Sequence, residues 1–264
     1  VTVHDLIFIR YPKLYKPVDV YIHKRKVNHA VQAASKVVAI SEQTKSDLLE
    51  FTGISKEKVS VIYQGCHRVF KNKLTQKAKE KIRTKFRLPY EYVLYVGTLE
   101  ERKNALSIAK ALKDSSRHMV FIGKVKAHGE KLKSFVAENK MQNRVIFIEG
   151  IGIEDLAGVY QNASVFCYPS FFEGFGIPII EALYSGVPVV TSKGGCFSEA
   201  GGSASLYVDP KDEKALGHAI NTLFSESEEK RKSRIQEGIS YVQRFNDDVI
   251  VAQWQELYQS ITHG

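Results

Sequence analysis

Residues 168–190 read YPSFFEGFGIPIIEALYSGVPVV, and this stretch decides how the rest of the chain is interpreted. Glu173 lies in a loop after the apolar run ASVFCYP (163–169), and Glu181 lies on a helix predicted to begin near Ile177. Backbone amides at a helix start can hold an anion, and carboxylates accept hydrogen bonds from sugar hydroxyls. The stretch therefore predicts a pocket for a phosphate with polyols on both sides. The alternative is a plain turn followed by a helix on which Glu181 faces solvent.

Around this stretch, short β-branched or aromatic runs alternate with amphipathic segments, which is typical of a parallel sheet covered by helices. The predicted strands are VTVHDLIF (1–8), KVVAIS (36–41), KVSVIYQG (58–65), EYVLYVG (91–97), RHMVFIG (117–123), RVIFIEG (144–150), ASVFCYP (163–169), GVPVVTS (186–192) and ASLYVDP (204–210). The predicted helices cover residues 18–33, 42–51, 104–113, 129–140, 153–162, 177–185, 211–224, 228–244 and 248–261. The fold class is therefore α/β.

Composition places the protein among ordinary globular chains. Its 264 residues are 44% apolar and 25% charged, which suffices for a core and excludes a disordered or fibrous class. No apolar run approaches the roughly 20 residues that cross a bilayer, and the first residues show no secretory leader. The three cysteines, Cys66, Cys167 and Cys196, have no metal-like spacing, which favours buried free thiols in a reducing compartment.

Positive charge is concentrated in the first half of the chain. Residues 1–140 hold 29 Lys and Arg against 13 Asp and Glu, whereas the remaining residues hold 9 against 16, so any basic surface belongs to the first part. In KNKLTQKAKEKIRTKFR (71–87), Lys77, Lys81 and Lys85 would share one exposed stripe of a helix. The stripe is either a solvated face or a surface that attracts anions. Among anionic partners a membrane fits better than nucleic acid, because no aromatic interleaving or nucleic-acid motif accompanies the charge.

A second loop carries the residue types of a phosphate site. In YVGTLEERKN (95–104) a predicted strand ends at Gly97, and Arg102 and Lys103 stand together before the next helix. Glycine lets backbone approach a phosphate closely, arginine offers a planar two-pronged donor, and lysine offers a point charge. Because ligands bind at the carboxyl ends of parallel strands, these residues are candidate diphosphate ligands. The alternative is an ordinary connection with solvated charges.

Taken in their order along the chain, the motifs resemble those of the retaining family 4 glycosyltransferases of the GT-B fold, and among them those of mannosyltransferase-like members. SFFEGFGIPIIEAL (170–183) resembles the family signature, in which two glutamates eight positions apart bracket the nucleotide-sugar. The resemblance runs from Val1 to about residue 261. Its further motifs are VGTLEERKN (96–104) for the diphosphate loop, EGIGIEDLAGVYQNASVFCYPS (149–170) near the base, and SLYVDPKDEKALGHAI (205–220) for the late strand and helix.

The resemblance implies which residues bind the donor. Arg102 and Lys103 would hold the diphosphate with the backbone of Gly97 and of Thr98, where many relatives place an additional arginine. Glu181 would accept hydrogen bonds from the ribose. The amides that would hold the phosphates or the sugar are those of Gly174, Phe175, Gly176 and Ile177.

The resemblance also implies two catalytic candidates, His4 and Glu173. Glu173 would contact the sugar hydroxyls near the reacting carbon, and His4, in VTVHDL (1–6), would lie beside the transferred sugar while Asp5 shapes the loop. The implied reaction retains the anomeric configuration, because the acceptor attacks the face from which the diphosphate departs. The scheme needs no cofactor and no metal, and the sequence has no aspartate pair or His/Cys cluster at metal-ligand spacing.

Two Rossmann-like domains are expected from the GT-B resemblance. Residues 1–70 would form part of the amino-terminal, acceptor-side domain, and residues 71–244 the carboxyl-terminal domain that binds nucleotide-sugar. Residues 245–264 would form a helix that packs back toward the amino-terminal domain. Since enzymes of this GT-B kind usually need roughly 350 to 400 residues in two domains and this chain has 264, the resemblance implies that about 100 residues of the amino-terminal domain are lacking here.

The expected function is hexose transfer from a nucleoside-diphosphate sugar, with GDP-mannose favoured, to a saccharide or lipid-linked acceptor in polysaccharide or glycolipid synthesis. The expected location is the cytoplasm, with peripheral contact at the inner face of an anionic membrane through residues 71–87. No nucleic acid is expected as a partner. The main alternative is a fragment that binds the donor nucleotide without transferring the sugar. A sugar-nucleotide epimerase with the same fold and a nucleic-acid-binding basic patch are further alternatives.

Overall fold

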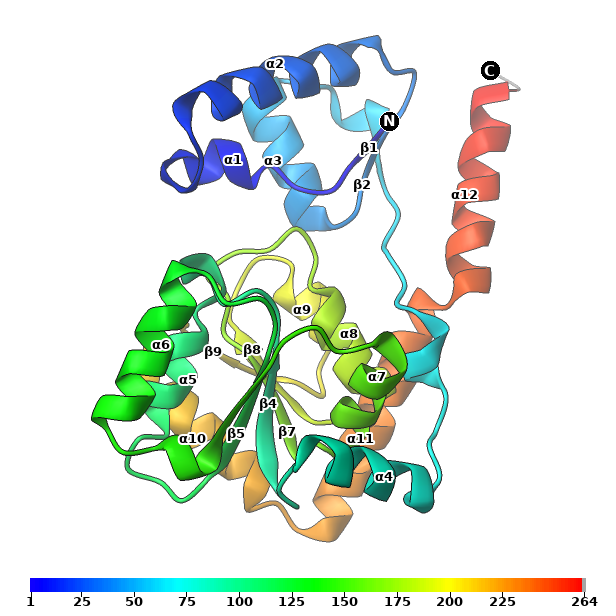
Figure 1. The fold of residues 1–264 in the computed structure, drawn as a ribbon. Coiled ribbons are helices and arrows are strands. Elements are labelled where there is room, and N and C mark those ends of the chain that lie inside the picture. The colour runs from blue at the N-terminus through cyan, green and yellow to red at the C-terminus, as the bar shows by residue number, and fades with distance from the viewer. Residues whose placement is uncertain (263–264) are drawn as a thin grey trace. The chain divides into compact units, whose positions relative to one another are not determined.

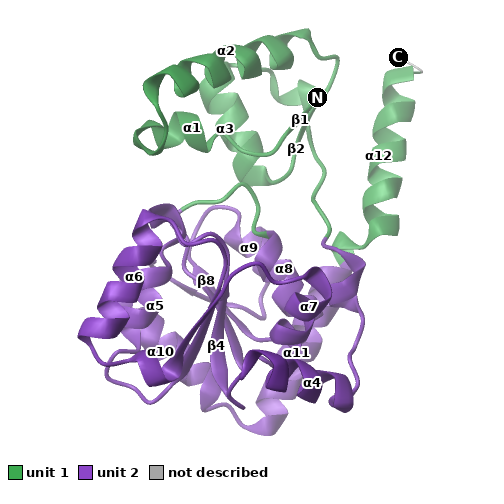
Figure 2. Ribbon diagram, viewed as in Figure 1, with its two compact units in different colours: residues 1–65, 172–176, 244–264 green, residues 66–171, 177–243 purple. Residues whose placement is uncertain are grey.

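The computed structural model describes residues 1–262 (Figure 1). They divide into two compact units (Figure 2). Unit 1 comprises residues 1–65, 172–176 and the described part of 244–264, and unit 2 comprises residues 66–171 and 177–243. The sequence-based division was drawn after residues 70 and 244 and did not separate residues 172–176 from their neighbours. Residues 263 and 264 of the expected closing helix lie outside the described residues.

Unit 2 is built on a parallel sheet of six strands in the order β6-β5-β4-β7-β8-β9. The strands are β4 (Tyr92–Val96), β5 (His118–Ile122), β6 (Val145–Ile148), β7 (Val165–Tyr168), β8 (Val189–Ser192) and β9 (Leu206–Val208). The order along the sheet changes direction between β4 and β7, which are paired at Val93 and Val165. The carboxyl ends of these two strands flank the switch point at which doubly wound sheets bind ligands.

Helices cover both faces of this sheet, with α5, α6 and α10 on one face and α4, α7, α8 and α11 on the other (Figure 1). The helices of unit 2 are α4 (Gln76–Phe86), α5 (Ala105–Ala111), α6 (Ala127–Glu138), α7 (Ile153–Asn162), α8 (Ile177–Tyr184), α9 (Phe197–Gly201), α10 (Glu213–Phe224) and α11 (Glu228–Val242). Because both faces are covered, the central strand β4 is an almost continuous apolar run from Tyr92 to Val96, as expected for a buried parallel strand.

Unit 1 contains a parallel sheet in the order β1-β2-β3, formed by β1 (Thr2–Val3), β2 (Val37–Ala39) and β3 (Val59–Val61). Its helices are α1 (Ile7–Arg10), α2 (Pro17–Ala33), α3 (Glu42–Thr52) and α12 (Asp247–Thr262). A core of buried side chains fills the space between the sheet and the helices α1, α2 and α3. Its members are Val3, Leu6, Phe8, Val31, Val37, Ala39, Leu48, Ile54 and Val59.

Each predicted strand contains an observed strand, but the first one ends earlier than expected. The prediction of a strand over residues 1–8 is wrong beyond Val3, because a carboxylate oxygen of Asp5 accepts a hydrogen bond from the backbone N–H of Ile7 (3.0 Å). This side-chain contact turns the chain into α1. All three cysteines are buried thiols that form no disulfide, as predicted. Within residues 1–262, no helix combines the length and the apolar character that spanning a bilayer requires.

Candidate functional site

The predicted diphosphate loop follows β4 at the switch point of unit 2. Gly97 has a φ of 152°, and a side-chain carbon there would lie 3.2 Å from the hydroxyl oxygen of Tyr95. Both the dihedral and the crowding favour glycine. The Tyr95 hydroxyl donates to the carbonyl oxygen of Thr98 (3.1 Å), which fixes the next peptide. The loop then makes a short 3-10 turn, Glu101–Lys103, and ends at Asn104 with a φ of 56°.

Asn104 and Arg102 connect this loop to the segments after β7 and β9. The amide of Asn104 donates to the carbonyl oxygens of Pro169 (3.1 Å) and Pro210 (2.8 Å). The carbonyl oxygen of Arg102 accepts from the backbone N–H of Phe171 (2.8 Å) and from the hydroxyl of Ser170 (3.1 Å). Asn104 was not among the predicted site residues. The signal for it was an asparagine between a loop and a helix, where the left-handed conformation is common.

The two predicted cations have different anchors in unit 2. The guanidinium of Arg102 pairs with the carboxylate of Glu100 (2.9 Å), and the ammonium of Lys103 donates to the hydroxyl of Tyr168 (2.8 Å). Burial raises the pKa of Glu100, but a hydrogen bond from Lys126 and the charge of Arg102 outweigh it and hold that pKa below its usual value. Glu100 is therefore an ionised partner of Arg102.

Glu181 is half-buried on α8, the helix that begins at Ile177. Its Oε2 accepts a hydrogen bond from the hydroxyl of Tyr160 on α7 (3.0 Å). Burial raises the pKa of Glu181 to about 7, although the hydrogen bond from Tyr160 acts in the opposite direction. The alternative that Glu181 simply faces solvent is therefore wrong. Chemically, the side chain is a carboxyl that titrates near neutrality beside a phenol.

Tyr160, the partner of Glu181, is a second side chain that sequence reasoning missed. It is fully buried, and its ring packs edge-on against Phe70 and tilted against Phe166 at centroid distances of 5.5 and 5.3 Å. Burial and the neighbouring Glu181 raise the pKa of its phenol well above the usual value, so Tyr160 stays a hydrogen-bond donor. The available signal was Glu181 itself, because a glutamate among apolar neighbours is costly to bury without a partner.

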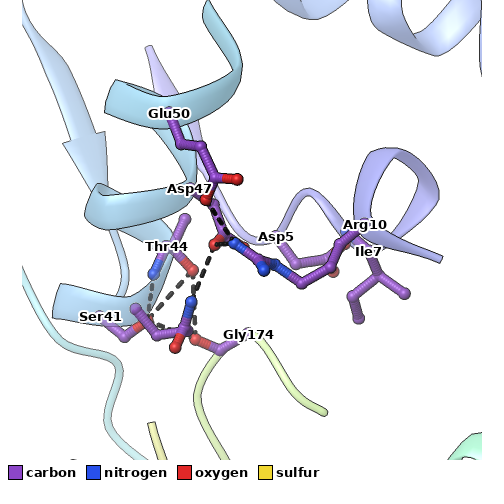
Figure 3. Close-up of polar contacts among 9 residues, drawn as sticks. Asp5, Ile7, Arg10, Ser41, Thr44, Asp47, Glu50 and Gly174 are labelled. Atoms are coloured by element: carbon purple, nitrogen blue, oxygen red, sulfur yellow. Dashed lines mark hydrogen bonds and ion pairs between the residues drawn. The ribbon is translucent and has the colours of Figure 1, made fainter. Parts of the chain in front are cut away.

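The loop Phe172–Gly176, which carries Glu173, belongs to unit 1. The hydroxyl of Ser41 donates to the carbonyl oxygen of Gly174 at 2.5 Å, and Figure 3 shows Thr44 beside the same oxygen (3.2 Å). Ser41 is also the N-cap of α3, since its hydroxyl accepts from the backbone N–H of Thr44 (3.0 Å). The peptide that follows Glu173 is thus fixed by hydroxyls at the start of α3.

His4 lies next to the same peptide within unit 1. The carbonyl oxygen of His4 is 3.2 Å from the Thr44 hydroxyl, and a side-chain carbon at Gly174 would lie 2.3 Å from that carbonyl oxygen. Only glycine permits this approach. The imidazole of His4 is exposed, with its Nδ1 3.3 Å from the amide nitrogen of Gln64. Unit 1 therefore brings together His4 and the loop of Glu173, whose side chain is 9% exposed.

Aromatic contacts hold both ends of this loop within unit 1. The ring of Phe172 packs against Tyr11 and lies 5.6 Å from the guanidinium of Arg10, which also pairs with the buried carboxylate of Asp47 (2.6 Å). At the other end, Phe175 stacks on Tyr63 with centroids 5.3 Å apart. The loop is fixed along its length and not only at Gly174.

The lysine-rich segment forms α4, with its lysine stripe exposed and its apolar side chains turned inward, as predicted. Lys77, Lys81 and Lys85 are exposed, while Ile82 packs so closely on α7 that a side-chain carbon at Gly158 would lie 2.7 Å from it. One of the three lysines is already engaged, because Lys85 pairs with Asp155 at 2.5 Å. Lys77 and Lys81 are therefore the more suitable residues for testing an interaction with anions.

The predicted site residues fall into two groups, each within one unit. Unit 2 holds the loop of Gly97, Thr98, Arg102 and Lys103, together with Ile177 and Glu181 on α8; unit 1 holds His4, Glu173, Gly174, Phe175 and Gly176. Over residues 1–262, no three His, Cys, Asp or Glu side chains gather closely enough to form a metal site.

Comparison with known proteins identifies relatives. The family model for "Glycosyl transferases group 1" matches residues 76–240. The chain is 29% identical to the O-antigen chain mannosyltransferase RfbU of Salmonella typhimurium and 25% identical to O-antigen chain mannosyltransferase B of Escherichia coli, over 94% and 86% of its length. It spans 65% and 61% of those two proteins. Among solved structures, HepE of Anabaena in complex with UDP and glucose is similar over 99% of this chain and 70% of the HepE chain, with a TM-score of 0.83 and 21% sequence identity. This likeness confirms the predicted GT-B fold class.

Proposed function

The chain belongs to the group 1 glycosyl transferases, and from this membership we propose that it transfers a hexose from a nucleoside-diphosphate sugar to a saccharide or lipid-linked acceptor. Mannose from GDP-mannose is the proposed donor group, because two relatives are O-antigen mannosyltransferases. The same two names support a surface polysaccharide or its lipid-linked precursor as the product.

One arrangement in unit 2 carries the proposal. Cationic side chains follow β4, and an acidic side chain with a neutral partner lies on α8 after β7, so opposite kinds of ligand group are available at one switch point. Lys103, whose ammonium donates to the hydroxyl of Tyr168 at 2.8 Å, would also donate a charge-assisted hydrogen bond to a diphosphate oxygen. Glu181 would accept hydrogen bonds from the ribose of the same nucleotide.

The proposed chemistry is displacement at the anomeric carbon. The bond between that carbon and the diphosphate oxygen breaks, the acceptor oxygen bonds to the same face, and the departing phosphate takes the acceptor proton. Positive charge from Arg102 and Lys103 and the backbone amides from Gly174 to Ile177 would stabilise the charge that develops on the leaving group. His4 and Glu173 would contact the transferred sugar. The proposed reaction uses no metal ion, so a chelator should leave its rate unchanged.

A second candidate function is donor binding without transfer. The chain spans less than two thirds of its mannosyltransferase relatives, and acceptor contacts in those longer proteins can lie in the part that this chain does not match. In that case this chain binds the nucleotide and releases no sugar.

The test is calorimetric titration with GDP, UDP and ADP without metal, on the wild type and on two variants. Glu181→Ala and Arg102→Ala/Lys103→Ala should each weaken binding of the preferred nucleotide at least about tenfold, as expected for loss of charged hydrogen bonds. The matched controls are Glu154→Ala and Lys211→Ala/Lys214→Ala, which remove the same charges from exposed positions. Binding that survives in both site variants would exclude the proposed donor site.

Release of GDP from GDP-mannose then separates the two candidate functions. Release in the presence of saccharide or lipid-linked acceptors supports the transferase, and binding without release supports the second candidate. Binding of UDP or ADP in place of GDP would contradict the proposed donor.

A further inference from the structure

We propose that the hydroxyl of Tyr160 positions the carboxylate of Glu181 for the ribose of the donor nucleotide. This inference rests on the proposed function and adds to it a residue that would not touch the nucleotide. Tyr160 is thus a positioning residue. Its effect should be confined to ligands that carry the ribose hydroxyls.

The first support is the fixed direction of the phenol. Tyr160 has no exposed surface, and Phe70 and Phe166 pack against its ring from two sides. Its single hydroxyl proton has two acceptors within reach, Glu181 at 3.0 Å and the carbonyl oxygen of Pro178 at 3.4 Å. The shorter contact and the charge of the carboxylate both favour Glu181.

The second support is the pattern of contacts around the carboxylate. Within residues 1–262, the Tyr160 hydroxyl is the one hydrogen-bond partner of the Glu181 carboxylate, and it occupies Oε2. A carboxylate has two oxygens with about four acceptor positions. The Tyr160 contact therefore restricts the rotation of the carboxylate and leaves Oε1 for an outside donor, such as a ribose hydroxyl.

The third support is that the tyrosine selects the acceptor form of its partner. A phenol that donates its only proton requires an acceptor at Oε2, which the ionised carboxylate always provides. Ribose hydroxyls also donate. Tyr160 and the ribose would thus both donate hydrogen bonds to the same ionised carboxylate. A protonated Glu181 would instead place a competing donor in the site.

The experiment compares ribonucleotide with 2′,3′-dideoxynucleotide binding. The probe is whichever of GDP, UDP and ADP the wild type binds most tightly, with its 2′,3′-dideoxy counterpart. Tyr160→Phe keeps the buried ring and removes only the hydroxyl. We expect it to weaken binding of the ribonucleotide about tenfold, the lower end for a hydrogen bond to a charged group, and to leave dideoxynucleotide binding unchanged.

Tyr92→Phe is the matched control. Tyr92 is also fully buried, and its hydroxyl donates to the carbonyl oxygen of Val159 in the same turn of α7, but it does not contact Glu181. If Tyr160 acted only by stabilising α7, both substitutions would change binding of both ligands. Glu181→Gln provides a second test, because adding Tyr160→Phe to it should cause no further loss.

The outcomes separate this inference from the proposed function. A wild type that binds no nucleotide overturns both. A wild type that binds the ribonucleotide, with Tyr160→Phe equal to it, overturns the positioning role alone. Equal losses for the ribonucleotide and the dideoxynucleotide overturn it as well. Thermal unfolding of each variant shows whether it is folded. If Tyr160→Phe does not fold, Phe70→Leu, which removes a ring that packs against Tyr160, takes its place, and an affinity equal to wild type or an equal loss for both ligands overturns the positioning role.

Discussion

The hydroxyl of Ser41 donates to the carbonyl oxygen of Gly174, 133 positions later in the chain, at 2.5 Å. The same oxygen atom of Ser41 caps α3. One small side chain therefore starts a helix and holds the peptide beside Glu173, a catalytic candidate.

Ser41→Ala should lower the free energy of unfolding more than loss of a helix cap alone. The cap is worth about 1 kcal/mol, and a buried carbonyl that loses a partner adds about 1 kcal/mol. Ser227→Ala is the matched control, because Ser227 caps α11 from an exposed position (3.3 Å to the N–H of Lys230). Urea denaturation measures both variants. Equal losses would show that the contact with Gly174 contributes nothing.

Gly174→Ala should abolish sugar transfer and weaken nucleotide binding much less, because Arg102, Lys103 and Glu181 belong to unit 2. A side-chain carbon at Gly174 would lie 2.3 Å from the carbonyl oxygen of His4, so the backbone beside Glu173 must move. Gly152→Ala is the control, since no atom lies within 4 Å of the added carbon there. The measurement is sugar transfer alongside nucleotide titration. Full transfer by Gly174→Ala would mean that the position of this peptide does not matter for the reaction.

Glu181 should make the free energy of unfolding depend on pH. Burial raises its pKa to about 7 from 4.5, so the folded protein keeps a proton that the unfolded chain releases between these values. The resulting stabilisation is complete below the lower value and is lost as pH rises through the upper one. Relative to wild type, Glu181→Gln should therefore gain about 2 kcal/mol between pH 5 and pH 8. Urea denaturation at both pH values tests this, with Glu154→Gln as the exposed control. A difference from wild type that stays constant with pH would contradict it.

Nucleotide affinity should change with pH in the opposite direction. The ionised Glu181 accepts hydrogen bonds from ribose, so affinity should rise as pH increases through about 7. The 2′,3′-dideoxynucleotide corrects for ionisation of the phosphates, because it has the same phosphates without the ribose hydroxyls. Titrations from pH 6 to pH 8 should show the additional rise only for the ribonucleotide. The same pH dependence for both ligands would remove Glu181 as the cause.

We propose that α4 makes the membrane contact expected from the sequence, so Lys77→Glu/Lys81→Glu should reduce binding to vesicles that contain anionic phospholipid. Each lysine near an anionic surface is worth about 1 kcal/mol, and the attraction is screened by salt. Lys211→Glu/Lys214→Glu changes the net charge equally at other exposed positions. Cosedimentation at low and high salt is the measurement. Equal effects of the two double variants would assign the binding to net charge and not to this helix.

The order of elements could be predicted because most strands are short apolar runs that end at a structure-breaking residue. EYVLYVG, for example, became β4 with Gly97 directly after it. The exposed and packed sides of α4 could be predicted as well, because a spacing of four placed Lys77 and Lys81 outward and Ile82 inward. The first strand was predicted too long because apolar residues 6–8 fit a strand or a helix equally well, and the side chain of Asp5 decided the matter.

The partners of the site residues could not be predicted, because they come from elsewhere in the fold. Tyr160 precedes Glu181 by 21 positions, and the resemblance of its stretch, residues 149–170, singled out no residue as a partner of Glu181. Packing of α7 beside α8 joins the two. The two cations could be named from YVGTLEERKN, but the anchor of Lys103 is Tyr168, 65 positions later. Such contacts depend on tertiary structure and leave no local pattern.

The chain enters unit 1 three times, and this affects how hybrid enzymes could be assembled from it. A hybrid made by exchanging the segments before residue 66 and after residue 243 would take its loop 172–176 from the other parent. That loop would then meet Ser41, Thr44 and the backbone of His4 from a different protein. A hybrid that keeps unit 1 intact therefore needs four crossover points, at 65/66, 171/172, 176/177 and 243/244. Residues 172–176 should come from the same parent as the two terminal segments.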